Sequence, residues 1–258
     1  MRTRPPREEV SLSGEGEAHT ASSEPQRVVL AFVNPASGGQ RGEQVLDTLR
    51  NLVPSDWIFD LGQAGGPSTG IDHLRRSVQG QDPTSVAPLN VSVLICGGDG
   101  TFSWVASALS KSGLVGACDI RVIPVPLGSG NDMARALGWG IRYPGASGLE
   151  LAVLAAMNPK ESRLGELDVW KLTCHCASPL VDSEPSPSFR RAEYFCNYLS
   201  LGIDAKIELE FNEARWRNPE RYSSQRGNIA AHTRLGASAM FLGPRVALYR
   251  LFDEIIFC

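Results

Sequence analysis

The sequence predicts an α/β fold, in which a parallel sheet flanked by helices is followed by a smaller β-rich unit. From residue 27 to about residue 137, short β-rich runs alternate with stretches of helical character, and glycine-rich turns follow three of the runs. This alternation is typical of βαβ units, whose crossovers make neighbouring strands parallel. The 258 residues, 42% of them apolar and 21% charged, are enough to bury a sizeable core.

The parallel sheet is expected within residues 27–158, which we interpret as the first domain. Its expected strands are short apolar runs at Val28–Val33, Trp57–Leu61, Val91–Ile95 and Ile120–Val125. The expected helices, at Gln40–Leu52, Ile71–Gln79, Phe102–Leu109 and Asp132–Leu137, follow these strands in turn. Residues 1–26 are rich in Glu, Ser, Pro, Gly and Thr and are expected to form a disordered tail.

The pattern changes in residues 159–258, which we interpret as a second domain. Gly165–Thr173 and Glu193–Leu201 are strand-like and are joined by a Ser/Pro-rich loop at Ala177–Ser188, which favours an antiparallel pair. Between Asp204 and Arg217, apolar residues are mixed with many charged ones, as is typical of a long surface helix.

Charge and targeting signals narrow the function classes. The net charge is −3, from 25 Lys and Arg residues against 28 Asp and Glu residues, so no overall field would draw the chain onto nucleic acid or anionic lipid. The N-terminus lacks the apolar segment of a secretory signal, and no apolar run is long enough for a membrane span. We therefore expect a cytoplasmic protein with no nucleic-acid partner and no transmembrane segment.

The six cysteines are scattered without paired spacing, which is typical of a reducing compartment. The cluster Cys174-His175-Cys176 resembles part of a metal site, but it lacks a C-x-x-C step and a second pair of ligands. We interpret it as alternating residues of a strand. This cysteine cluster is therefore not expected to form a zinc site.

The segment Gly97–Thr101, reading G-G-D-G-T, lies directly after an expected strand and directly before an expected helix. Its glycines let backbone N–H groups approach an anion, and a helix start adds partial positive charge, so the segment is a candidate phosphate cradle. Asp99 would repel phosphate unless a cation lay between them or its carboxylate accepted a substrate proton, which indicates magnesium or base chemistry. The alternative is a tight turn in which Asp99 caps the helix.

Two more glycine loops are expected at the same edge of the sheet. Pro126–Asp132 carries Ser129, Asn131 and Asp132 beside two glycines, a set that suits recognition of hydroxyl or phosphate groups. Its alternative interpretation is an Asx-type turn that caps the next helix. Asn34–Gly39 follows the first strand. Because ligands of open α/β sheets bind at the carboxyl ends of the strands, three such loops predict a ligand site. The loops match neither a Walker P-loop nor a G-x-G-x-x-G motif.

Together these residues resemble the diacylglycerol kinase catalytic domain of the lipid kinase superfamily, over about Val28 to Gly236. Asn34–Gly39 is similar to the family's N-P-x-S-G-G segment, Gly97–Thr101 to its G-G-D-G-T loop, and Leu127–Asp132 to its L-G-[ST]-G-N-D element. Ala134–Gly140 is specifically similar to the eukaryotic diacylglycerol kinases. Three further segments are similar to the same group: Leu167–Leu172, Asn197–Ala205 and Phe211–Gly227.

The resemblance implies a two-domain fold of the NAD kinase/diacylglycerol kinase type that uses ATP and Mg²⁺. The implied reaction phosphorylates 1,2-diacylglycerol to phosphatidic acid at a membrane surface, with the protein bound peripherally. Asp99 would act near the transferring phosphoryl group, through magnesium or as the base. The implied ATP contacts are Asn34, Ser37, Gly38, Gly97, Gly98, Gly100, Thr101 and Asp168. The implied acceptor side comprises Gly128, Ser129, Gly130, Asn131 and Asp132. Phosphoryl transfer depends mainly on positioning and charge neutralisation, which glycine loops and Mg²⁺ can supply.

The chain departs from the family pattern at its C-terminal end. Full-length members of the superfamily continue with further strands and an acidic D-G element that returns to the nucleotide site, and this element is missing before Cys258. We therefore expect an incomplete β-rich second domain. The apolar segment Ala237–Cys258 is expected to pack against another surface.

Two other functions stay open from the sequence. One is a different kinase of the superfamily, acting on a sphingoid base, ceramide or NAD; NAD kinases share the G-G-D-G-T loop, whereas the P-L-G-S-G-N-D and A-R-A-L-G-W-G runs resemble lipid kinases. The other is a catalytically inactive protein that binds nucleotide or lipid, which the missing C-terminal element favours.

Overall fold

The computed structural model describes residues 27–37, 41–79, 90–158, 165–174, 191–200, 202–222 and 224–242. The expected tail 1–26, the Ser/Pro-rich loop 177–188 and the apolar segment from residue 243 onward lie outside the described residues. The same holds for Gly38, His175 and Cys176.

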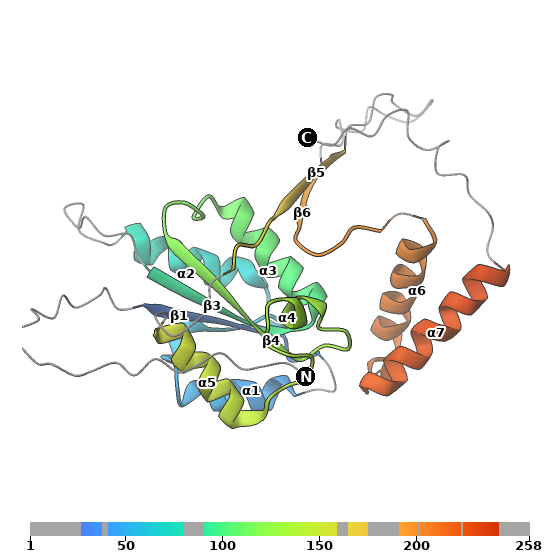
Figure 1. The fold of residues 1–258 in the computed structure, drawn as a ribbon, viewed down its shortest axis with the longest axis horizontal. Helices are drawn as coiled ribbons and strands as arrows, with labels where there is room; N and C mark the ends of the chain where they lie inside the picture. Colours follow the sequence, from blue (N-terminus) through green and yellow to red (C-terminus); the bar gives the residue numbers. More distant parts are fainter. Residues whose placement is uncertain are drawn as a thin grey trace, which may run out of the picture.

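A four-stranded parallel sheet lies at the centre of the first part of the chain (Figure 1). Its spatial order is β2 (Ile58–Asp60), β1 (Val28–Val33), β3 (Asn90–Gly97) and β4 (Asp119–Pro126). All three neighbouring pairs are parallel, which confirms the α/β prediction. The chain passes from β1 outward to β2 and then to β3 on the other side of β1, so the strand order reverses between β1 and β3. In open α/β sheets a ligand binds at such a switch point.

Helices cover both faces of the sheet (Figure 1). The helices α1 (Gly42–Arg50) and α5 (Gly145–Met157) pack on one face, while α2 (Pro67–Gln79) and α3 (Asp99–Ser112) pack on the other. The strands alternate between the two cores; in β1, for example, the odd-numbered Val29, Ala31 and Val33 join α1 and α5, and the even-numbered Leu30 and Phe32 join α2 and α3. Burial on both faces explains why the central strands β1 and β3 are mostly apolar runs.

Helix α5 was not among the elements expected from the sequence. Its buried residues are Leu149, Ala152, Val153 and Ala156, but Leu151 and Leu154 on the same helix are 67% and 53% exposed. Because apolar residues occur on both its buried and its exposed sides, the segment shows little of the amphipathic period that identifies a surface helix. The short α4 (Asp132–Ala136) lies within the expected helix 132–137.

Arg27 joins the amino ends of β3 and β4, at the edge of the sheet opposite to the glycine loops. Its buried guanidinium donates hydrogen bonds to the carbonyl oxygens of Val91, at 3.1 Å, and Asp119, at 3.4 Å. It also pairs with the Asp119 carboxylate. These bonds satisfy a buried charge that would otherwise destabilise the fold.

The later part of the chain contains an antiparallel strand pair and two helices. The strands β5 (Trp170–Cys174) and β6 (Arg191–Phe195) form the antiparallel pair that the sequence predicts. The expected long helix is α6 (Ile203–Arg217), and a short 3₁₀ turn at Pro219–Tyr222 leads to α7 (Gln225–Leu242), which was not expected. Buried Phe211 of α6 joins the two helices, because its ring stacks on His232 of α7 with centroids 3.7 Å apart.

None of the described helices combines the length and the apolar character that a membrane span requires. Within the described residues, no group of three or more His, Cys, Asp or Glu side chains is arranged to hold a metal ion.

We expect Cys96 to be unreactive towards a soluble thiol reagent in the native protein. Its side chain is fully buried in the core beside α1 and α5, and burial raises the pKa of its thiol, so the reactive thiolate is scarce. Labelling with dithionitrobenzoate or iodoacetamide, followed by peptide mass spectrometry, measures this reactivity. Half-buried Cys196 serves as the reference that should react faster. Labelling of Cys96 in native protein as fast as in denaturant would contradict the prediction.

Candidate active site

The three glycine loops meet at the carboxyl ends of β1, β3 and β4, as the sequence predicts. Backbone hydrogen bonds continue from the strands into the loops: Asn34 N–H donates to the Cys96 carbonyl at 3.0 Å, and Leu127 N–H donates to the Gly97 carbonyl at 2.9 Å. The loop after β3 therefore lies between the other two, and the β1 and β3 loops flank the point where the strand order reverses.

The loop after β1 is tied to the start of α3 by side-chain hydrogen bonds. The Asn34 Nδ2 group donates to Thr101 Oγ1 at 2.8 Å, and Asn34 Oδ1 accepts the Ala36 N–H at 3.1 Å. Buried Ser37 lies with its Oγ 3.5 Å from Thr101 Oγ1. The amide of Asn34 thus orients its own loop and the third residue of α3 at the same time.

The loops after β3 and β4 are in direct backbone contact at two glycines. A Cβ atom built on Gly128 would lie 2.4 Å from Gly98 Cα, and one built on Gly98 would lie 3.0 Å from Gly128 Cα. Real side chains do not tolerate the shorter distance, so a residue larger than glycine at position 128 would push the two loops apart. The candidate phosphate cradle and the loop after β4 are therefore parts of one candidate site.

Asn131 shapes the loop after β4. It adopts a left-handed backbone conformation, with φ of 58°, and its side chain is buried. The amide oxygen accepts the Gly128 N–H, and the amide nitrogen donates to the carbonyl oxygens of Gly128 and Ile141, each at 2.8 Å. Asn131 occupies the N-cap position of α4, but its side chain makes no hydrogen bond that caps this helix and instead holds the loop itself.

Asp99 bridges the loops after β3 and β4. It is the first residue of α3, and Gly98 occupies the cap position, so the alternative in which Asp99 caps its own helix is wrong. Instead, its Oδ1 accepts the Met133 N–H of α4 at 2.9 Å. The second oxygen, Oδ2, faces Gly130, because a Cβ built there would lie 3.1 Å from it and 3.6 Å from Asp132 Oδ2. The half-buried carboxylates of Asp99 and Asp132 therefore flank the same glycine.

The start of α3 supplies backbone donors beside Asp99. Its first helical bond runs from Phe102 N–H to the Gly98 carbonyl, at 3.0 Å. The N–H groups of the preceding residues in a first helical turn have no intrahelical partner, and the helix dipole adds partial positive charge there. Exposed Gly100 leaves this turn open to a ligand. The arrangement is suited to bind an anionic group such as a phosphate.

The strand β6 packs against α3, so the segment after β6 lies near the start of the site, a feature that the sequence analysis missed. Burial and the negative charge of Asp99 raise the pKa of the Cys196 thiol, against the opposing effect of a hydrogen bond with Ser103 of α3. Partial burial and the carboxylates of Glu208, Asp99 and Asp132 raise the pKa of the Tyr198 phenol. The signal was present in the Asn197–Ala205 motif, to which no role was assigned.

Asp168 lies apart from this constellation. It is exposed in the segment that precedes β5, and no hydrogen bond of the described residues links it to the three loops. Its neighbour Leu167 packs against the core beside α2 and α3. A role of Asp168 near the nucleotide stays a prediction.

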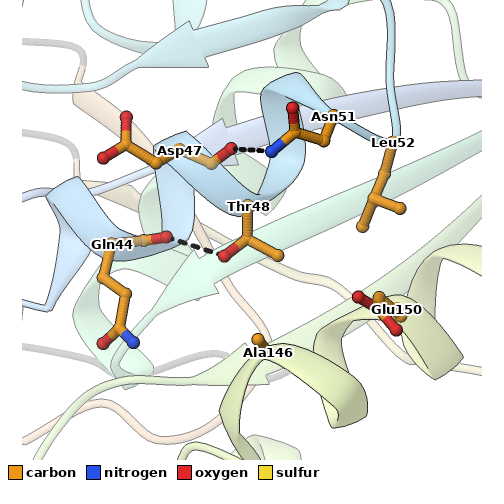
Figure 2. Close-up of a pocket in the computed structure, with 7 residues that line it drawn as sticks. All are labelled: Gln44, Asp47, Thr48, Asn51, Leu52, Ala146 and Glu150. Carbon is orange, nitrogen blue, oxygen red and sulfur yellow. Dashed lines mark hydrogen bonds between the residues drawn. The ribbon is translucent and has the colours of Figure 1, made fainter.

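A shallow hollow of about 550 Å³ between α1 and α5 is a separate feature (Figure 2). It is lined by Gln44, Asp47, Thr48, Asn51, Leu52, Ala146 and Glu150, none of which is a predicted site residue. Figure 2 shows that Thr48 and Asn51 bond to carbonyl groups of α1 itself, at 2.9 and 3.0 Å. Polar side chains used in this way are typical of a helix surface, so the hollow is not the candidate site.

Two family models match the chain. The diacylglycerol kinase catalytic domain matches residues 28–165, and the diacylglycerol kinase accessory domain matches residues 194–253. The first match includes all three glycine loops, and the second includes the Tyr198 segment, α6 and α7.

Curated relatives match over most of this chain. The eye-specific diacylglycerol kinase of Drosophila melanogaster is 36% identical over 218 residues, which cover 83% of this chain and 14% of the relative. Human diacylglycerol kinase theta is 34% identical over 211 residues, covering 81% of this chain and 21% of the relative. Human diacylglycerol kinase zeta is 32% identical over 240 residues, covering 84% and 24%. The chain thus spans less than a quarter of the length of these relatives.

A solved structure from Bacillus anthracis str. Sterne, described as that of a diacylglycerol kinase, aligns with 54% of this chain and 41% of its own chain. The sequence identity is 21% and the TM-score is 0.35, a likeness too low to compare the two folds in detail.

Proposed function

Because this chain belongs to the diacylglycerol kinase catalytic-domain family, we propose that it transfers the γ-phosphoryl group of ATP to the free hydroxyl of 1,2-diacylglycerol. The products are phosphatidic acid and ADP, and the hydroxyl proton is released. The observation that carries the proposal is the direct contact of the two glycine loops at Gly98 and Gly128, bridged by Asp99. A phosphate cradle and a polar acceptor loop lie together, as phosphoryl transfer requires.

The nucleotide phosphates would bind at the first turn of α3. The glycines of this segment leave room for a phosphate, and backbone N–H groups of the turn can donate to it. The residues concerned are Gly97, Gly98, Gly100 and Thr101. Asn34 and Ser37 hold Thr101 in place from the loop after β1. In this arrangement Asn34 and Ser37 orient the cradle, and the sequence-based prediction that Gly38 contacts the nucleotide stays a prediction.

The acceptor hydroxyl would lie on the side of the loop after β4, which comprises Gly128–Asp132. The Asn131 amide keeps this loop in one conformation, so its backbone and the Asp132 carboxylate stay in place beside Asp99. The Asp99 carboxylate is suited to accept the hydroxyl proton or to hold a metal ion, because Oδ1 is engaged with Met133 N–H and Oδ2 faces the Gly130 position.

The residues present fit Mg²⁺. The carboxylates of Asp99 and Asp132 both approach Gly130, and carboxylate oxygens are the protein ligands that Mg²⁺ prefers. When bound, Mg²⁺ would neutralise charge on the transferring phosphate. Asp132 Oδ1 also accepts a hydrogen bond from Arg135 at 2.8 Å, which fixes the orientation of that carboxylate.

Diacylglycerol is a membrane lipid, so we propose that the protein works while bound peripherally at the cytoplasmic surface of a membrane. Exposed apolar side chains follow β6 along the chain: Tyr198 and Leu199 are 66% and 44% exposed, and Ile203, the first residue of α6, is 47% exposed. Tyr198 is also close enough to Asp99 and Asp132 for their charges to affect its phenol. These side chains support an approach of the lipid from this direction.

The test is a phosphorylation assay with the purified 258-residue chain, MgATP and mixed micelles that contain 1,2-diacylglycerol. We expect labelled phosphatidic acid to form, and no labelled product with sphingosine, ceramide or NAD in its place. Phosphorylation of one of these substrates, but not of diacylglycerol, would identify a different kinase of the superfamily. Binding of MgATP by folded protein with no product from any acceptor would identify a nucleotide-binding protein that lacks activity.

A further inference from the structure

Arg215 of α6 reaches the nucleotide side of the candidate site. Its Nη2 group donates a hydrogen bond of 2.5 Å to the backbone carbonyl of Ala36, a residue 179 positions earlier in the chain. Figure 1 shows α6 on the side of the sheet at which β4 ends and α4 begins. A cation from the later part of the chain thus lies on the loop after β1.

The contact continues through hydrogen bonds to the candidate phosphate cradle. The Ala36 N–H donates to Asn34 Oδ1, and Asn34 Nδ2 donates to Thr101 Oγ1 in the first turn of α3. Arg215 is therefore linked to the cradle through Ala36 and Asn34 of the loop after β1.

Arg215 differs from two neighbouring cations of α6, which form ion pairs with carboxylates of the same helix. Arg217 pairs with Glu213 at 3.2 Å, and Lys206 pairs with Glu210 at 3.7 Å. Within the described part of the chain, the partner of Arg215 is a neutral carbonyl, which uses one of the five N–H donors of its guanidinium. Ordering a long side chain costs conformational entropy, and one neutral hydrogen bond at the surface contributes little free energy to offset that cost.

We propose that Arg215 binds the phosphate groups of the nucleotide when ATP is present. A guanidinium presents several donors in one plane, which match the oxygens of a phosphate group, and such charge-assisted bonds are about twice as strong as neutral ones. The inference rests on the proposed function, because it assigns a ligand contact to the same site. The family resemblance had assigned no role to this residue.

The test compares Arg215→Gln with Arg217→Gln, its matched control two positions along the same helix. Isothermal titration measures the Kd of each full chain for MgATP and for adenosine, which lacks the phosphates. We expect Arg215→Gln to weaken MgATP binding about tenfold or more and to leave adenosine binding within about twofold, because a charge-assisted bond to phosphate is lost. Arg217→Gln should bind both ligands like the wild type, and Arg215→Lys should recover part of the loss.

Two outcomes would overturn the proposal. If the Arg215→Gln variant binds MgATP as tightly as the wild type, whatever its melting temperature, then Arg215 only connects α6 to the loop after β1. Equal weakening of MgATP and adenosine would mean that the substitution disturbs the site as a whole. A wild-type chain that binds MgATP but makes no phosphatidic acid would overturn the proposed reaction alone, whereas one that binds no MgATP would overturn both.

Discussion

The Asp99→Asn variant is expected to lose about 100-fold or more of kcat in the diacylglycerol assay while it keeps its fold. Removal of one group that acts on developing charge at a reacting centre has effects of this size. The loss follows from either role of Asp99, since a neutral amide is a poor base and a weak ligand for Mg²⁺. Stability should be kept, because the amide oxygen of Asn can still accept the Met133 N–H.

The assay for Asp99→Asn measures kcat and KM for MgATP, with the melting temperature as the check on folding. Asp72→Asn is a matched control, because Asp72 is an exposed carboxylate on α2 that pairs with Arg75 and lies outside the three loops. Activity of Asp99→Asn within tenfold of the wild type would contradict the role assigned to Asp99. A large fall in its melting temperature would show that the charge is needed for the fold.

The Gly128→Ala variant is expected to lose both stability and activity. The new Cβ would lie 2.4 Å from Gly98 Cα and 2.9 Å from Asn131 Oδ1, and backbone atoms cannot turn away as a flexible side chain can. Overpacking of this kind lowers the free energy of unfolding by about 1–3 kcal/mol. Displacement of the two loops by about 1 Å would reduce kcat by about 100-fold, since phosphoryl transfer depends on positioning.

Urea unfolding and the phosphorylation assay measure the two effects of Gly128→Ala. Gly165→Ala is the matched control: a Cβ there meets no atom within 4 Å, so stability and kcat should stay close to the wild type. If Gly128→Ala unfolded like the wild type and kept its kcat, the close approach of the two loops would not be needed for function.

The two central strands of the sheet, β1 and β3, could be predicted from the sequence because both are buried on both faces. Val28–Val33 is a continuous apolar run for that reason, and its expected bounds agree with those of β1. Helices α5 and α7 could not be predicted in the same way. Apolar residues such as Leu151 of α5 and Ile229 of α7 are exposed in these helices, so the period of 3.6 residues does not separate a buried side from a solvent side.

The predicted site residues were identified from loop composition, and the structure brings most of them together. The sequence indicated that Gly97–Thr101 and Gly128–Asp132 lie at one edge of the sheet, because parallel strands end on the same side. For Asp99 and Asn131 the sequence left open an alternative in local turns, because a sequence motif shows only which residues are adjacent along the chain. In the structure Asp99 bonds to Met133, and the Asn131 side chain holds its own loop and Ile141.

The sequence by itself determined the α/β class, the three loops and the family resemblance, because burial period and glycine motifs are local properties of the chain. The tertiary structure decided which residues meet across long separations: Gly98 with Gly128, Asp99 with α4, and Arg215 with Ala36. Such contacts depend on strand order and on how helices pack, which are set by the free energy of burying the whole core. The Gly97–Thr101 motif predicts a phosphate-binding loop, but only the tertiary structure shows that Arg215 of α6 contacts the neighbouring loop at Ala36.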